Sequence, residues 1–259
     1  MHNELLKIGN ITIYGYGLMI AIGVILAYLV AEYRAKKRNL DSDPIFYIVI
    51  FSVIFGFLGA KLLYYITVLD EIIANPSLLM TSFSDGFVVY GGILAGILAA
   101  YIYCKIKKLH FLSYLDIAVP SVALAQGFGR IGCFLAGCCY GCESALPIAV
   151  TFKTSNYAPN GVALFPSQLV SSAFDFIHFF VLCALARKNK TAGKIGAFYL
   201  IFYSIGRFII EFFRGDLERG SVGSLSTSQF ISIFVAIAGI IMLMVLQKKE
   251  AEKVVTEEN

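Results

Sequence analysis

Residues 115–135 read LDIAVPSVALAQGFGRIGCFL, an apolar segment of membrane-spanning length that carries Arg130 near its end. A second such segment, IGAFYLIFYSIGRFIIEFF at 195–213, carries Arg207 and Glu211. Because a guanidinium keeps its charge, placing one at mid-bilayer depth costs roughly 2.5–3.5 kcal/mol on the most lenient scale, and such residues face a protein interior or a wet cavity. Glu211 lies one helical turn after Arg207 and is its predicted partner. Arg130 has no acid at helical spacing on its C-terminal side, so its predicted partner is the substrate.

The composition supports a membrane-embedded chain throughout. Of 259 residues, 58% are hydrophobic and 15% are charged, and the mean hydropathy is +0.78. A soluble domain has roughly 25% charged residues. Segments of about 20 apolar residues match the thickness of the hydrocarbon layer, and continuous runs of that kind predict helices. We predict an all-α, polytopic protein with seven spans: Ile13–Tyr33, Pro44–Val68, Phe87–Tyr103, Leu115–Leu135, Gln168–Ala186, Ile195–Phe213 and Gln229–Leu246.

The basic residues between the spans predict an orientation. Fourteen of them follow spans one, three, five and seven, and therefore lie on one side, whereas only four lie on the other side. The positive-inside rule then places the N-terminus outside and the C-terminus in the cytoplasm. The first group comprises Arg34, Lys36, Lys37, Arg38, Lys105, Lys107, Lys108, Arg187, Lys188, Lys190, Lys194, Lys248, Lys249 and Lys253; the second comprises Lys7, Lys153, Arg214 and Arg219.

The net charge of +4 is thus a topology signal and gives no reason to expect nucleic-acid binding. We predict one membrane domain, residues 1–247, followed by a short charged cytoplasmic tail, residues 248–259. Lys61 lies within a span, where it either binds a partner or extends its ammonium to the interface. The short glycine steps at 56–59 and 91–96 are typical of close helix packing.

Gly129 and Gly132 flank the Arg130–Ile131 pair and leave little side-chain bulk beside the guanidinium. A ligand phosphate can approach closely at such a position. The planar fork of an arginine also matches phosphate oxygens. These residues indicate an anionic lipid headgroup as the ligand.

Several further motifs accompany this one. Asp116 stands fourteen residues before Arg130. The other motifs are Tyr16-Gly17-Leu18-Met19 in the first span, Tyr90-Gly91-Gly92 at the third, Pro166-Ser167-Gln168-Leu169 at the fifth, and Tyr203, Arg207, Glu211 and Arg214 in and after the sixth. Together with the frame that runs from Gly129 to Gly141, this set resembles the prolipoprotein diacylglyceryl transferases, over nearly the whole chain.

The resemblance implies a reaction in the bacterial cytoplasmic (inner) membrane. The diacylglyceryl group of phosphatidylglycerol is joined as a thioether to the lipobox cysteine of a secreted prolipoprotein, and glycerol phosphate leaves. It implies that catalytic roles fall to Arg130, Arg207, Glu211, Tyr203 and Tyr16. It implies that substrate binding involves Arg130 together with Tyr90, Gly91, Gly92, Asp116, Gly129, Gly132, Gly141, Ser167, Gln168 and Arg214. The expected partners are phosphatidylglycerol, the prolipoprotein signal peptide and membrane lipid; no cofactor is expected.

The chain departs from the family signature at four positions. The asparagines of that signature fall on Cys133 and Ala136, its acid falls on Cys138, and its usual histidine before the third span is Tyr90. A tyrosine is a poor base at neutral pH. The departures leave open two other functions: transfer of a lipid unit to a different acceptor, and non-catalytic transport of an anionic lipid.

Four cysteines, Cys133, Cys138, Cys139 and Cys142, crowd the end of the fourth span. The Cys-x-x-Cys pair at 139 and 142 is compatible with a metal ligand set or with an external disulfide. One cysteine could instead accept the lipid group transiently. The interpretation we favour is that small thiols pack a glycine-rich turn, and we predict no metal.

Overall fold

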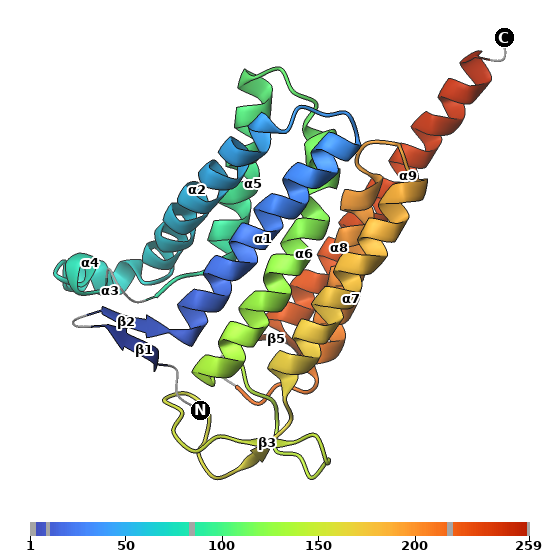
Figure 1. The fold of residues 1–259 in the computed structure, drawn as a ribbon. Coiled ribbons are helices and arrows are strands. Elements are labelled where there is room, and N and C mark those ends of the chain that lie inside the picture. The colour runs from blue at the N-terminus through green and yellow to red at the C-terminus, as the bar shows by residue number, and fades with distance from the viewer. Residues whose placement is uncertain (1–3, 9–10, 83–85, 217–219, 258–259) are drawn as a thin grey trace. The chain divides into compact units, whose positions relative to one another are not determined.

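The computed structural model describes residues 4–8, 11–82, 86–216 and 220–257; Arg219, counted above for the predicted orientation, lies outside them. Within this part, helices dominate (Figure 1). The long helices are α1 (Gly15–Lys37), α2 (Asp43–Thr67), α5 (Val89–Ile106), α6 (Phe111–Ala136), α7 (Ser167–Lys188), α8 (Lys194–Glu211) and α9 (Thr227–Glu257). Two short helices, α3 (Leu69–Ala74) and α4 (Leu78–Thr81), follow α2.

The prediction of a polytopic, helical membrane protein is confirmed. Six of these helices are long and apolar enough to cross a membrane: α1, α2, α5, α6, α7 and α9. The seventh predicted span corresponds to α8, which has 18 residues and carries Lys194, Arg207 and Glu211 within them. Because α8 is only 18 residues long, its apolar stretch includes all three charges, whereas each of the other six helices has an apolar stretch of that length with at most two, so a count of seven spans stays a prediction.

Most predicted span limits lie within a few residues of the helix ends, and both ends of the chain show a further difference. Ile13 belongs to a strand, because a hairpin of β1 (Glu4–Ile8) and β2 (Ile11–Tyr14) precedes α1. The charged residues from 248 onward, predicted as a separate tail, continue α9 as far as Glu257. Two more short hairpins occupy loops, namely β3 (Val150–Thr151) with β4 (Ala163–Leu164) and β5 (Ser221–Val222) with β6 (Leu225–Ser226).

The chain, predicted as one domain, divides into two compact units, one of residues 1–31 and 115–259 and the other of residues 32–114. The first unit contains α6, α7, α8 and α9. Its apolar core includes Val119 of α6, Leu182 of α7 and Ile195 of α8. Asp116 fixes the start of α8, since its carboxylate accepts hydrogen bonds of 2.8 Å from the backbone N–H groups of Gly193 and Gly196. A negative charge at the N-terminal end of a helix also interacts favourably with the helix dipole.

The second unit is built on the packing of α2 against α5. A Cβ placed on Gly91 would lie 2.3 Å from the carbonyl oxygen of Gly59, and one on Gly92 would lie 2.9 Å from that of Gly56. Only glycine permits backbones to approach so closely, which confirms the helix-packing interpretation of these steps. Lys61 of α2 is 6% exposed. Its ammonium donates hydrogen bonds to carbonyl oxygens of the same unit, so it has protein partners.

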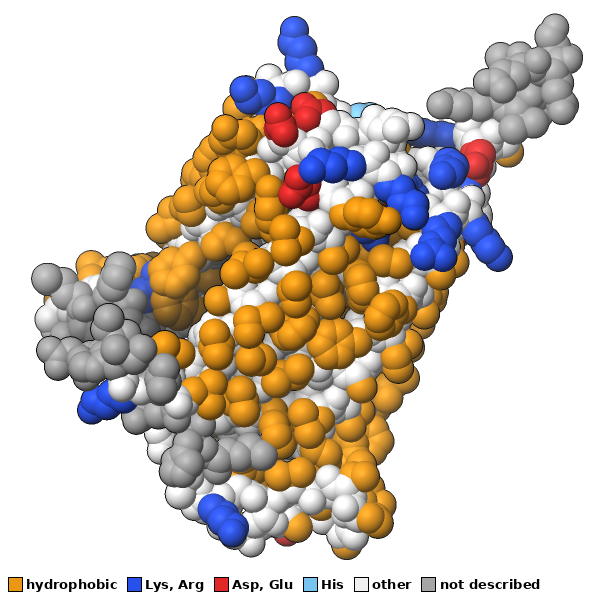
Figure 2. Space-filling model, viewed as in Figure 1, with side chains coloured by type: hydrophobic (Ala, Val, Ile, Leu, Met, Phe, Trp, Pro, Cys, Tyr) orange, Lys and Arg blue, Asp and Glu red, His pale blue; other side chains and the backbone are white. Residues whose placement is uncertain are grey.

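Apolar side chains cover the surface of the long helices. Figure 2 shows them spread over the visible face of α1, α6 and α7. In α7 they include Ile177, Phe180 and Val181, all exposed. A contiguous apolar surface of this kind is what a lipid environment requires.

Candidate functional site: a cationic cavity beside a cysteine cluster

The end of α6 is defined by a Schellman motif. Gly137 has φ +79°, its N–H donates to the carbonyl of Phe134 at 3.2 Å, and the N–H of Cys138 donates to the carbonyl of Cys133 at 3.1 Å. Glycine adopts this left-handed conformation without strain, which explains its position one residue past the helix. The motif places Cys138 directly above Cys133.

The head of α7 holds the loop that follows. Ser167 Oγ donates to the carbonyl of Cys139, and Gln168 Nε2 donates to the carbonyl of Cys138, each at 2.8 Å. Both side chains are buried. Neither residue lines the cavity between α6, α7 and α8. In the structure these two predicted substrate-binding residues therefore stabilise the loop.

The same loop pairs with the chain after α8. Gly141 and Arg214 form an antiparallel bridge. A Cβ on Gly141 would lie 2.3 Å from the carbonyl oxygen of Phe165 and 2.8 Å from that of Phe213. The arrangement therefore needs glycine at this position for backbone packing. Arg214, predicted to bind substrate, forms a bidentate pair with Asp216, at 2.9 and 2.7 Å.

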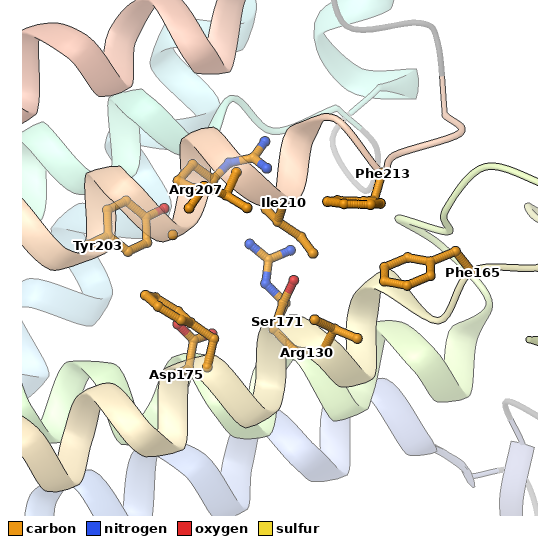
Figure 3. A pocket seen from close by; sticks show the side chains of 12 residues that line it. Arg130, Phe165, Ser171, Asp175, Tyr203, Arg207, Ile210 and Phe213 are labelled. Carbon is orange, nitrogen blue, oxygen red and sulfur yellow. The ribbon is translucent and has the colours of Figure 1, made fainter. Parts of the chain in front are cut away.

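A cavity of about 300 Å³ lies between α6, α7 and α8 of the first unit. Figure 3 shows its polar side chains, which come from three helices: Arg130 from α6, Ser171 and Asp175 from α7, and Tyr203 and Arg207 from α8. The rest of the lining is mostly apolar. Two lining residues, Val170 and Ile209, are 37% and 53% exposed, so the cavity reaches the apolar outer surface of the helices. The apolar part comprises Phe165, Val170, Phe174, Ile209, Ile210 and Phe213.

Arg207 has protein partners at this cavity. Its guanidinium lies 2.6 Å from the Glu211 carboxylate, and its Nη2 donates to Ser228 Oγ at 2.7 Å. The ion pair predicted from the four-residue spacing is confirmed. The paired Nη1 and Oε2 atoms are buried and are not aligned for a hydrogen bond. The contact is therefore electrostatic, and Glu211 is engaged in neutralising Arg207.

Arg130 differs from Arg207. Among the described residues, its guanidinium makes no hydrogen bond and no ion pair within 4 Å, although it lines the cavity. It interacts electrostatically with Asp175, Tyr203 and Cys133. A half-buried guanidinium that faces a cavity in this way offers its donor fork to an anion.

Asp175 is a site residue that the sequence analysis missed. It is buried in α7, lines the cavity and interacts electrostatically with Arg130. A carboxylate within an apolar span was the available signal, since such residues are rare unless they serve a function. His178, one turn further along α7, is stacked on Tyr199 at 5.2 Å between ring centroids and is not among the cavity residues.

The remaining predicted residues lie in several places. Asp116 is fully buried at the start of α8 and does not line the cavity, so its role in the structure is to cap that helix.

A Cβ on Gly129 would meet nothing within 4 Å, whereas Gly132 packs against Tyr16. Tyr16, at the start of α1, interacts electrostatically with Cys133, Cys138 and Cys139 and with Arg130. Tyr90, Gly91 and Gly92 belong to the second unit, at the start of α5.

The cysteines meet in a different combination from the expected one. The Sγ atoms of Cys133, Cys138 and Cys139 all lie within 4.8 Å of one another, whereas Cys142 is exposed and stands outside this group. None of the six cysteines forms a disulfide in the structure. Hydrogen bonds with Cys133 and Cys138, together with the neighbouring Arg214 guanidinium, hold the pKa of Cys139 below its usual value. Hydrogen bonds with Cys133 and Cys139 raise the pKa of Cys138.

The fold and the site define a class: a polytopic membrane protein with a cationic cavity that opens on its apolar surface. Comparison with known proteins narrows the class. The family model for prolipoprotein diacylglyceryl transferase matches residues 3–245. The chain belongs to this family.

Individual relatives agree with the family match. The chain is 50% identical to a phosphatidylglycerol–prolipoprotein diacylglyceryl transferase of Clostridium tetani, over 93% of this chain and 96% of the relative. It is 48% identical to an enzyme of Clostridium perfringens that bears the same name with the number 2, over 91% and 92%. A relative of that name in Finegoldia magna is 35% identical, over 94% and 95%.

Proposed function

We propose that this chain transfers the diacylglyceryl group of phosphatidylglycerol to the thiol of a lipobox cysteine in a secreted prolipoprotein, with release of glycerol phosphate. Membership of the family and the names of the relatives support the donor and the acceptor class. The single observation that carries the proposal in this chain is the Arg130 guanidinium, which faces a cavity without a hydrogen bond or ion pair to any described residue.

The cavity suits an anionic lipid on two counts. Arg130 and Arg207 supply positive charge where a headgroup phosphate would lie, and the apolar wall with Phe174 and Ile209 suits acyl chains. Arg207 is already neutralised by Glu211, so Arg130 contributes most of the uncompensated charge. Preorganised cations stabilise the charge that develops on a leaving phosphate, which is the main electrostatic demand of the reaction.

The transfer is a displacement at a glycerol carbon. A sulfur–carbon bond forms, the bond from that carbon to the phosphate oxygen breaks, and the electron pair leaves with glycerol phosphate. The acceptor thiol must lose its proton, because the thiolate is the nucleophile. We assign the removal of that proton to the carboxylate of Asp175, which lines the cavity. Glu211 is the weaker candidate for this base, because its carboxylate is paired with Arg207. Tyr203 lines the same cavity and orients headgroup oxygens through its hydroxyl.

The proposed location is the bacterial cytoplasmic membrane, with the cavity in its outer half. In the first unit, the loops after α6 and α8 pair with each other. Arg130 and Arg207 lie within two turns of these loops, while Arg187, Lys188 and Lys194 lie at the opposite ends of α7 and α8. The positive-inside rule directs the basic ends to the cytoplasm. The acceptor is a secreted protein and is therefore met at the other side.

A reconstituted assay tests the proposal. Purified protein in vesicles that contain phosphatidylglycerol is incubated with a synthetic lipobox peptide, and the expected product is the peptide with the mass of one diacylglyceryl group added. The same peptide with serine in place of the lipobox cysteine, and vesicles of phosphatidylethanolamine alone, are the controls that give no adduct. Absence of the adduct from the complete mixture, or its formation on the serine peptide, would overturn the proposal.

A further inference from the structure

The cluster of Cys133, Cys138 and Cys139 has the geometry of a metal ligand set. Its three Sγ atoms lie within 4.8 Å of one another. Three sulfurs bound to one tetrahedral zinc ion at 2.3 Å are separated by about 3.8 Å. The separation of the three thiols is therefore close to the one that a zinc ion requires.

The backbone that carries the cluster is fixed on both sides. The Schellman motif at Gly137 sets Cys138 above Cys133, and the side chains of Ser167 and Gln168 bind the carbonyls of Cys139 and Cys138. Cys139 itself has φ +59°, a left-handed conformation that costs energy for a residue with a Cβ. A strained ligand residue in a hydrogen-bonded loop is typical of a preorganised site.

The charges around the cluster favour a divalent ion. Three thiolates and one divalent cation carry a net charge of −1, whereas a monovalent cation would leave −2. Arg130 interacts electrostatically with Cys133 and Cys139, so its positive charge favours a cluster that carries a net negative charge. Arg214 lies beside Cys139 as well, but it is already neutralised by Asp216. Thiolate ligands select soft or borderline metals over magnesium or calcium.

We propose that Cys133, Cys138 and Cys139 bind one thiophilic divalent cation, zinc or an ion of similar preference, with a fourth position open to water or another ligand. Binding exchanges three thiol protons for the metal and needs no oxidant. The prediction of no metal considered the pair Cys139 and Cys142; the helix end brings Cys133 into the group in place of Cys142. The three ligands are half-buried, which leaves the fourth position accessible.

Metal analysis of the purified chain tests the site directly. The full chain, produced with an affinity tag free of histidine, is reduced, incubated with zinc and freed of excess metal, and the expected content is about one zinc ion per chain. The content should fall at least tenfold in the triple Cys→Ser variant of the cluster and stay unchanged in the matched controls. These controls are Cys142→Ser and the double variant Cys104→Ser with Cys183→Ser, all outside the cluster.

A second measurement uses the unaltered protein, so it does not depend on the folding of any variant. Zinc should slow the alkylation of Cys133, Cys138 and Cys139 by N-ethylmaleimide at least tenfold, and a chelator should restore the rate. The exposed Cys142 serves as the internal reference, because its rate should not change. Equal rates with and without zinc, a zinc content far below one per chain, or a disulfide within the cluster in the reduced protein would overturn the proposal. Both measurements report binding and are independent of transferase activity.

Discussion

The guanidinium of Arg207 lies 2.6 Å from the carboxylate of Glu211, one turn further along α8, with side chains only 11% and 6% exposed. Removing one partner of such a pair leaves an uncompensated charge in a low-dielectric environment. The pair therefore links the stability of α8 to the charge of the cavity that this helix lines.

Arg207→Ala should lower the free energy of unfolding by about 3–5 kcal/mol, because Glu211 would remain buried without its cation. The double variant Arg207→Ala with Glu211→Ala should be more stable than Arg207→Ala alone. Thermal unfolding of the detergent-solubilised proteins measures both effects. A melting temperature of Arg207→Ala equal to that of the unaltered protein would contradict the stabilising role of the pair.

Arg130→Lys should reduce transferase activity at least about 100-fold while preserving the melting temperature. Lysine retains the charge but loses the planar fork that contacts two phosphate oxygens at once. The mass-gain assay measures the loss. Arg187→Lys, at the exposed basic end of α7, is the matched control and should leave turnover unchanged. Turnover of Arg130→Lys close to that of the control would argue against phosphate recognition by Arg130.

Asp175→Asn should lower kcat by about 10²–10⁴-fold if this carboxylate removes the thiol proton. The loss should shrink as the pH rises toward 9, because the acceptor thiol, with a pKa of about 8.5, then ionises without a base. Arg130→Lys should show no such recovery. A pH profile of Asp175→Asn parallel to that of the unaltered enzyme would assign the proton transfer to another group.

Asp116→Ala should destabilise the protein without weakening the donor. Its carboxylate accepts two backbone hydrogen bonds at the start of α8, and their loss costs about 1–3 kcal/mol. Unfolding experiments measure that cost, while the KM for phosphatidylglycerol of the remaining folded enzyme should stay within about twofold. A large increase in KM with unchanged stability would return Asp116 to the substrate-binding set.

Two glycines of the signature should respond differently to alanine. Gly141→Ala introduces a Cβ 2.3 Å from a backbone carbonyl oxygen and should lower stability by about 1–3 kcal/mol. Gly129→Ala meets nothing within 4 Å and should preserve the melting temperature. Matched thermal unfolding curves check the difference. Equal destabilisation by the two substitutions would show that the loop packing around Gly141 is not specific.

Local rules explain which parts of the structure could be predicted from the sequence. The spacing of Arg207 and Glu211 fixes a helical ion pair whatever the tertiary fold, and long apolar runs fix membrane helices. The role of Gly91 and Gly92 could also be predicted, since close helix packing needs residues without a Cβ. In each case the relevant neighbours lie within a few residues or the composition alone decides.

The parts of the site that could not be predicted depend on contacts between residues that are far apart in the sequence or on the geometry of a turn. Asp175 meets Arg130 only because α7 packs beside α6, and the cysteine cluster depends on the left-handed turn at Gly137. For the same reason the spacing of Cys139 and Cys142 could not show that the Sγ atom of Cys139 lies close to those of Cys133 and Cys138. Asp116 was predicted to bind substrate, but its carboxylate accepts hydrogen bonds from N–H groups that lie about 80 residues away along the chain.

The exposed apolar residues at the margin of the cavity, Val170 and Ile209, have a kinetic consequence. A donor that arrives past them diffuses in two dimensions within the bilayer and never crosses the aqueous phase. The variable that sets saturation is then the mole fraction of the donor among all lipids, so that diluting it with neutral lipid slows the reaction even when its bulk concentration is held constant.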